Sequence, residues 1–150
     1  MNNIINESTL QGAWRLVSWQ IDYSDGRPSS YPYGNDADGL LLYTHDGMMS
    51  ANIAHAQRSR LSTESTRHAP DPEKCQAFDS YFSYAGHYYV EGEFVVHQVS
   101  HSLNPNFPGS EQRRHIRFVD GDLELSAQDQ LPGSEVNRTH RLRWRRPPKS

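Results

Sequence analysis

Two residues, His97 and Arg114, combine a reactive side chain with a position on a strand face that is otherwise apolar. His97 lies in residues 93–101, which we expect to form a strand joined to residues 84–90 by a two-residue turn at 91–92. Side chains alternate between the faces of a strand, so His97 should point to the inner face. That face also carries Tyr84, Tyr88, Val90, Val95 and Val99. An imidazole titrates near pH ~6.5, and we predict that His97 acts there as an acid or base.

Other residues of this hairpin would shape the surroundings of the His97 imidazole. The predicted turn pairs His97 with Gly86, and a residue without a side chain would leave a space beside the ring. Tyr84 and Tyr88 would supply aromatic walls with hydroxyl groups for a ligand, although plain core roles would also account for them. A core histidine hydrogen-bonded to a neighbouring hydroxyl is likewise a sufficient explanation of His97. The hairpin therefore predicts either a reactive pocket or a polar part of the core.

Arg114 is placed by the next hairpin, in which residues 120–121 (Asp-Gly) are a strong turn signal. Pairing across this turn sets Arg114 opposite Ala127 on the apolar face. The same pairing sets Arg117 opposite Glu124 on the outer face, as an ordinary charge pair in solvent. An inward guanidinium is costly unless an anion satisfies it. We predict that Arg114 clamps a ligand anion or a developing oxyanion, with a structural ion pair or loop carbonyls as the alternatives.

Four further residues are candidates for ligand binding. His101 shares the strand phase of the predicted histidine site, and Phe118 lies on the apolar face of the second hairpin. Asn104 and Asn106 belong to residues 102–110, a loop too rich in proline for a strand, which should lie at one mouth of the barrel. Both asparagines could cap a ligand there. As neighbours of a proline they also have an ordinary explanation as turn residues.

Most of the chain is predicted to form strands joined by short turns. Counting the two strands that flank residues 120–121, there are eight strands, nearly all next to their sequence neighbours. This number is typical of a small closed antiparallel up-and-down barrel, which can hold one small ligand. The fold class is thus mainly β with one short α-helix. The remaining predicted strands cover residues 11–22, 39–45, 48–55, 84–90, 93–101 and 136–144.

The helix is expected over residues 72–83, because an aspartate cap at Asp71 followed by proline is a specific start signal. Cys75, Phe78 and Phe82 then fall on one face at helical spacing. This stripe predicts a helix that packs against the barrel or closes one of its ends. Cys75, on the apolar stripe, should be inert.

The inner face of the hairpin at residues 39–55 is ambiguous. Leu40, Leu42, Met49 and Ala51 make the more apolar face. We therefore expect Tyr43 to lie outside the barrel or at its edge.

Composition and charge limit the classes of partner. The 150 residues should form one domain over residues 1–150, with a net charge of −3 that gives no electrostatic case for nucleic acid. The basic segment 141–146 is interpreted as a last strand with solvated outer arginines. The single cysteine, the lack of a signal-like N-terminus and the lack of a membrane-length apolar run favour a cytoplasmic protein that makes no membrane contact. A homodimer is left open.

Cofactor and metal motifs are missing from the sequence. There is no phosphate loop, no dinucleotide fingerprint and no nucleophile elbow. The eight histidines show no chelating spacing, so we predict neither a metal site nor a cofactor.

Several motifs are distributed along nearly the whole chain: Gly12-x-Trp14, Trp14-Arg-Leu-Val-Ser18, Tyr31-Pro-Tyr-Gly34, Gly39-Leu-Leu-Leu-Tyr43, Asp46-Gly47-x-Met49-Ser50, Tyr84-x-Gly86-x-Tyr88, His97, Ser102-Leu-x-Pro105-Asn106-x-x-Gly109 and Gln112-x-Arg114. Together they resemble the lipocalin-like domain proteins of bacteria and fungi. The resemblance implies a calycin-type barrel in which Trp14 packs at the closed end, under an arginine such as Arg141 or Arg143. It also implies that related small barrels carry ligands or catalyse isomerisations and cyclisations without a cofactor.

The sequence therefore predicts a barrel that binds a small, mostly apolar or aromatic molecule with an anionic or enolic oxygen. If it is an enzyme, the reaction should be isomerisation, dehydration or cyclisation without a cofactor, as an isomerase, lyase or cyclase. A carrier using the same cavity without chemistry is the main alternative. A packed barrel that serves as an interaction module is a third.

Overall fold

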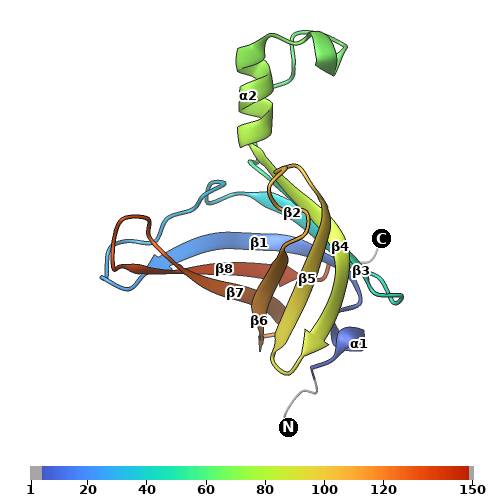
Figure 1. The fold of residues 1–150 in the computed structure, drawn as a ribbon, viewed down its shortest axis with the longest axis vertical. Helices are drawn as coiled ribbons and strands as arrows, with labels where there is room; N and C mark the ends of the chain where they lie inside the picture. The colour runs from blue at the N-terminus through green and yellow to red at the C-terminus, as the bar shows by residue number, and fades with distance from the viewer. Residues whose placement is uncertain (1–4, 149–150) are drawn as a thin grey trace.

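The computed structural model describes residues 5–148 and shows a closed antiparallel barrel of eight strands in sequence order (Figure 1). The predicted fold class is confirmed. Each strand pairs with its sequence neighbours, and the last strand pairs with the first, so no sheet edge is left open. The strands are β1 (Gly12–Tyr23), β2 (Asp38–Tyr43), β3 (Met48–Ala54), β4 (Tyr81–Glu91), β5 (Phe94–Ser102), β6 (Glu111–Val119), β7 (Asp122–Gln130) and β8 (Asn137–Arg145).

The register of the β4–β5 hairpin differs from the prediction by two residues. The turn lies at residues 92–93, so Tyr88 pairs with His97 and Gly86 pairs with Val99. A shift of two keeps every side chain on its predicted face. Gly86, however, does not leave a space beside the imidazole. A Cβ there would overlap the carbonyl oxygen of Gln98, so this glycine allows the two backbones to approach closely at a register shift.

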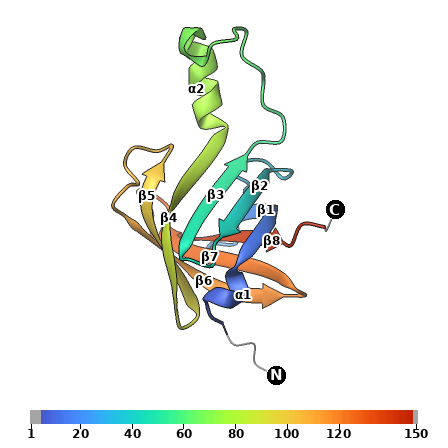
Figure 2. The same cartoon turned by 90° about the vertical axis from the view of Figure 1, so that its right-hand side faces the viewer.

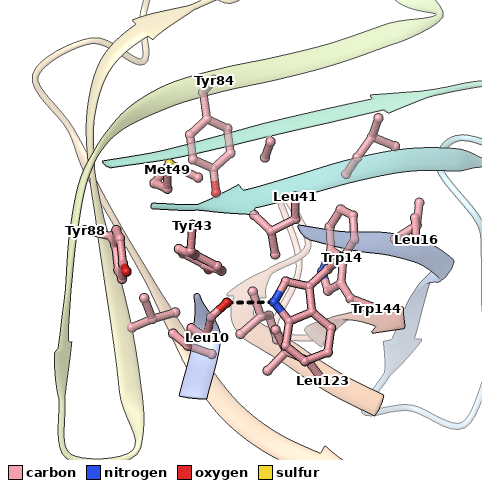
Figure 3. Close-up of a cluster of buried hydrophobic side chains, with 14 of the residues drawn as sticks. Leu10, Trp14, Leu16, Leu41, Tyr43, Met49, Tyr84, Tyr88, Leu123 and Trp144 are labelled. Atoms are coloured by element: carbon pink, nitrogen blue, oxygen red, sulfur yellow. Dashed lines mark hydrogen bonds between the residues drawn. The ribbon is translucent and has the colours of Figure 1, made fainter. Parts of the chain in front are cut away.

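The short helix α1 (Glu7–Leu10), which was not predicted, closes one end of the barrel. Leu10 is fully buried, and its carbonyl oxygen accepts a hydrogen bond from Trp14 Nε1 at 2.8 Å (Figure 3). The guanidinium over the Trp14 ring belongs to Arg146, 3.7 Å from the ring centroid, and not to either arginine suggested by the resemblance. The three tight hairpin turns lie at this closed end, because the strands alternate in direction from β1 to β8.

The helix α2 (Asp71–Asp79) neither packs against the barrel wall nor closes its end, contrary to the prediction. It projects away from the barrel at the end opposite α1 (Figures 1 and 2). Phe78 is 49% exposed and Cys75 is exposed. The helix stops at Asp79 because Phe82 pairs with Ile53 in β4, where its ring packs against the core. A short 3-10 helix, Thr66–His68, precedes α2, and no helix among residues 5–148 is long and apolar enough to span a membrane.

The β2–β3 hairpin turns the opposite face of β2 inward from the one expected. Leu40 and Leu42 are 50% and 42% exposed, whereas Leu41 and Tyr43 are buried. Met49 and Ala51 do point inward as predicted, and in the observed register they pair with Tyr43 and Leu41. Paired residues share a face, so the two inward residues of β3 fix the face of β2.

The outer surface of β7 and β8 carries buried carboxylates covered by arginines. The predicted pair of Arg117 and Glu124 is present at 2.9 Å, but Glu124 is buried because a second arginine, Arg141, also binds it at 3.0 Å. Arg143 and Arg145 contact buried Asp122 at 2.7 and 2.9 Å. The arginines of β8 are therefore ion-paired, and not simply solvated as the sequence suggested.

Candidate functional site

A cavity of about 350 Å³ lies inside the barrel, between the buried core and the end of the barrel opposite α1. This volume lies within the range of small-molecule sites, and the wall is mostly apolar and aromatic. Exposed Gln128 and Asp129 mark where it meets solvent. The other lining residues are Trp19, Leu41, Ala51, Ile53, Phe82, Tyr84, His97, Phe107, Gln112, Arg114, Leu125, Ala127, His140, Leu142 and Trp144.

His97 points into the barrel as predicted and lies between two tyrosine hydroxyls. Its Nε2 is 2.6 Å from Tyr43 Oη and its Nδ1 is 2.7 Å from Tyr84 Oη. The imidazole is only 1% exposed. Burial, followed by the charge of Arg114, lowers the pKa of His97 to about 3, so the ring is neutral at pH 7. Both ring nitrogens are thus engaged by tyrosine hydroxyls, which occupy the hydrogen-bonding positions of the imidazole.

Tyr43 is the site residue that the sequence analysis placed wrongly. Its ring is completely buried, and burial raises the pKa of its hydroxyl well above the usual value. The signal that could have found it was the inward phase of Met49, since the residue paired with Met49 must share its face.

Arg114 lines the cavity, half-buried, on the predicted inner face. Its Nη2 donates to Gln112 Oε1 at 3.2 Å, and its Nη1 donates to the Arg113 carbonyl oxygen at 3.1 Å. Within residues 5–148 no carboxylate lies within 4.0 Å of its guanidinium. Its positive charge also opposes the rise in the pKa of Tyr84 that burial causes. Arg114 is therefore a cavity cation whose hydrogen-bond partners among residues 5–148 are neutral.

Tyr84 lines the cavity, whereas Tyr88 and Phe118 belong to the packed core beside it. Tyr88 packs on Tyr43 with ring centroids 4.6 Å apart, and its hydroxyl donates to the Thr44 carbonyl oxygen at 2.8 Å. Phe118 is half-buried against the core cluster. Of these three residues, Tyr84 alone lines the cavity.

The remaining predicted ligand residues lie away from the cavity. At the register shift between β4 and β5, Ser100 of β5 has no partner in β4, and His101 is left exposed with its Nδ1 2.9 Å from Ser100 Oγ. Asn104 Oδ1 accepts a hydrogen bond from the Asn106 backbone N–H at 2.9 Å. Both asparagines are therefore turn residues, the alternative to ligand binding that the sequence also predicted. From this loop it is Phe107 that lines the cavity.

A chain of polar residues that the sequence did not reveal frames the mouth. Trp19 Nε1 donates to His140 Nδ1 at 3.2 Å, and His140 Nε2 lies 3.5 Å from Asp129 Oδ2. Arg138 binds the same carboxylate at 2.7 Å. Burial lowers the pKa of His140, and both of its ring nitrogens have partners. His140 therefore links Trp19 to Asp129 at the mouth of the cavity, and both of its ring nitrogens are engaged in these contacts.

One donor in the cavity wall lacks a partner altogether. Trp144 lies at the closed half of the barrel, and its indole N–H is buried with no acceptor among the described residues. With Arg114 and Tyr84 it makes the inner wall rich in donors. These same residues 5–148 contain no group of three or more His, Cys, Asp or Glu side chains arranged to hold a metal ion.

Comparison with known proteins agrees with this architecture. The model of the lipocalin-like domain family matches residues 11–147, from the first strand to just beyond the last. No curated protein and no solved structure matches the chain. Because the match covers most of the chain and the fold is the expected barrel, this chain belongs to the lipocalin-like domain family.

Proposed function

We propose that the barrel binds one small, mostly apolar molecule whose anionic or enolic oxygen is held by Arg114. The observation that carries this proposal is a cavity guanidinium without a carboxylate partner among the described residues. A positive group in an apolar wall is costly unless an anion compensates it, and the residues that the structure describes provide Arg114 with neutral acceptors alone. Aromatic walls from Trp19, Phe82 and Phe107 suit a flat or aromatic ligand.

The same site suits cofactor-free proton chemistry, namely isomerisation, dehydration or cyclisation. Arg114 would stabilise negative charge on the ligand oxygen as it develops. His97 would act as acid or base through the tyrosine hydroxyls that bracket it. A neutral imidazole can accept a proton at one nitrogen while it releases one from the other, so it need not become charged inside the core. A carrier without chemistry uses the same cavity, and the full engagement of both His97 nitrogens favours that second candidate.

Binding is tested with 4-nitrophenol, which becomes a coloured anion, and with 4-nitroanisole, its neutral methyl ether. We expect the wild-type protein to prefer the nitrophenolate by about tenfold or more, since charge-assisted hydrogen bonds are the stronger ones. Arg114→Gln should lose this preference. Arg113→Gln is the matched control, because Arg113 faces outward over Phe94. The proposal would be contradicted if wild type, like Arg114→Gln, bound nitrophenolate and 4-nitroanisole with equal affinity.

Chemistry is tested by incubating wild type and His97→Gln with a metabolite extract. Bound and free molecules are then separated by chromatography and identified by mass spectrometry. A compound converted by wild type alone, including an isomer of unchanged mass, identifies an enzyme that needs His97. A compound that both proteins bind and return unchanged identifies a carrier.

A further inference from the structure

We propose that Tyr84 is the neutral hydrogen-bond donor that meets the ligand oxygen beside Arg114, and that Tyr43 fixes its direction through His97. The inference rests on the proposed function for the presence of a ligand. The positions of the hydrogens, by contrast, follow from the geometry of Tyr43, His97 and Tyr84 without a ligand. Here Tyr84 is the contact residue, while His97 and Tyr43 are positioning residues.

The first step is a count of hydrogens in the triplet. A neutral imidazole carries one N–H donor and one lone-pair acceptor. One tyrosine must therefore donate to the ring, and the other must accept from it. The accepting tyrosine keeps its own hydroxyl hydrogen, which has to find another acceptor.

The surroundings decide which tyrosine accepts. Tyr43 is completely buried and is not part of the cavity wall, and within residues 5–148 its hydroxyl has His97 as its only hydrogen-bond partner. If Tyr43 accepted, its hydrogen would be buried without an acceptor, at the full cost of desolvation. Tyr84 lines the cavity, and its hydroxyl is directed into the barrel (Figure 3). Its hydrogen can therefore reach an oxygen of a bound molecule.

The resulting arrangement has one direction. Tyr43 donates its O–H to His97 Nε2, His97 donates its Nδ1–H to Tyr84 Oη, and Tyr84 donates its O–H into the cavity. Successive hydrogen bonds polarise one another, so Tyr84 becomes a stronger donor than an isolated phenol. Burial also keeps the Tyr84 hydroxyl protonated, because it raises the pKa of that group.

The direction is tested by NMR of the ¹⁵N-labelled protein, through the long-range couplings between the carbon-bound ring protons of His97 and its two nitrogens. At neutral pH we expect the Nδ1–H tautomer. Free histidine in water prefers the Nε2–H form, so the expected result is not the default one. The Nε2–H tautomer in wild type would overturn the proposal.

A second measurement uses the nitrophenol probe with the two conservative tyrosine variants. Tyr84→Phe should weaken nitrophenolate binding by about tenfold, the effect of one hydrogen bond to a charged acceptor, while 4-nitroanisole affinity changes little. Tyr43→Phe should change nitrophenolate affinity by less than about threefold, because it removes only the polarisation. Equal losses in both variants would contradict the assignment of Tyr84 as the contact.

The two proposals can fail separately. If wild type binds neither probe, the proposed ligand class is wrong, and the tautomer measured by NMR still decides the direction of the hydrogen bonds. If nitrophenolate binds through Arg114 but the tautomer is Nε2–H, only the assignment of Tyr84 is lost.

Discussion

Arginines lie on both faces of the barrel wall, and their environments are opposite. On the outer face, Arg143 and Arg145 hold the buried carboxylate of Asp122 with contacts of 2.7 to 3.0 Å. On the inner face, the hydrogen bonds of Arg114 within residues 5–148 go to a side-chain amide and a backbone carbonyl. An arginine whose charge the chain compensates contributes to the fold. An arginine left to neutral partners in a cavity is available to a ligand.

The largest expected effect is a loss of protein stability at low pH, caused by the buried His97 on the inner face. Folding lowers the pKa of His97 from 6.5 to about 3, so between these values the unfolded chain binds more protons than the folded one. Lowering the pH from 6 to 4 should therefore reduce the free energy of unfolding by about 2 to 3 kcal/mol. Urea unfolding measured across this range would show the loss.

His97→Gln isolates the contribution of that group. Its stability should fall less steeply between pH 6 and 4, since the titrating imidazole is gone. A parallel fall in wild type and variant would show that His97 is not the group responsible.

The outer face should respond in a different pH window and to a different substitution. Arg145, and then Arg143, lower the pKa of Asp122, so its stabilisation is present above about pH 4 and is lost as the pH falls further. Asp122→Asn leaves two arginines without their carboxylate and should destabilise the protein by about 2 kcal/mol at pH 7.

Asp25→Asn is the matched control for this change. It breaks the exposed pair with Arg27 at 2.6 Å and should cost clearly less stability than Asp122→Asn, because solvent screens the exposed pair. Similar losses of unfolding free energy in the two variants would remove the distinction between buried and exposed pairs.

The contrast can be abolished by giving Arg114 a carboxylate of its own. Gln112 already accepts from Arg114, so Gln112→Glu would place an internal anion beside the guanidinium. We expect nitrophenolate affinity to fall by about tenfold, as the site becomes neutral, while 4-nitroanisole affinity is retained. Gln98→Glu adds the same charge on the exposed outer face and should leave both affinities unchanged. Unaltered nitrophenolate binding by Gln112→Glu would argue against Arg114 as the anion site.

The smallest effect is expected for the stability of Arg114→Gln. Because its guanidinium makes no ion pair with the described carboxylates, its removal should leave the free energy of unfolding unchanged or raise it slightly, as an uncompensated inward charge is lost. Chemical denaturation without ligand measures this directly. A loss comparable to that of Asp122→Asn would mean that Arg114 serves the fold as the outer arginines do.

The sequence predicted those features that depend on local signals. The turn at residues 120–121 fixed the observed register of β6 and β7, including the opposition of Arg117 and Glu124. Strand alternation then placed His97 and Arg114 on the inner face, which the structure confirms. These inferences succeeded because turn chemistry and the two-residue period act within a single hairpin.

Other features failed where a residue's position depended on distant packing. Phe82 continued a helical pattern, yet it lies in a strand, where its partly buried ring packs against Trp19 and Tyr84. His101 was in phase with the site until the register shift beside Gly86 turned it outward. No local pattern in the sequence marks either event.

The sequence by itself therefore determined the eight strands, their order and the inward positions of a histidine and an arginine. Only the tertiary structure decided that Tyr43 and Tyr84 meet the two nitrogens of His97, since Tyr43 lies 54 residues from His97 along the chain. Closure of the barrel between β1 and β8 also brings Arg141 to Asp22, whereas Arg114 finds no carboxylate among the described residues. The physical reason is that strand phase is a local property. The partners of an inward side chain, by contrast, are set by which strands the closed sheet brings together.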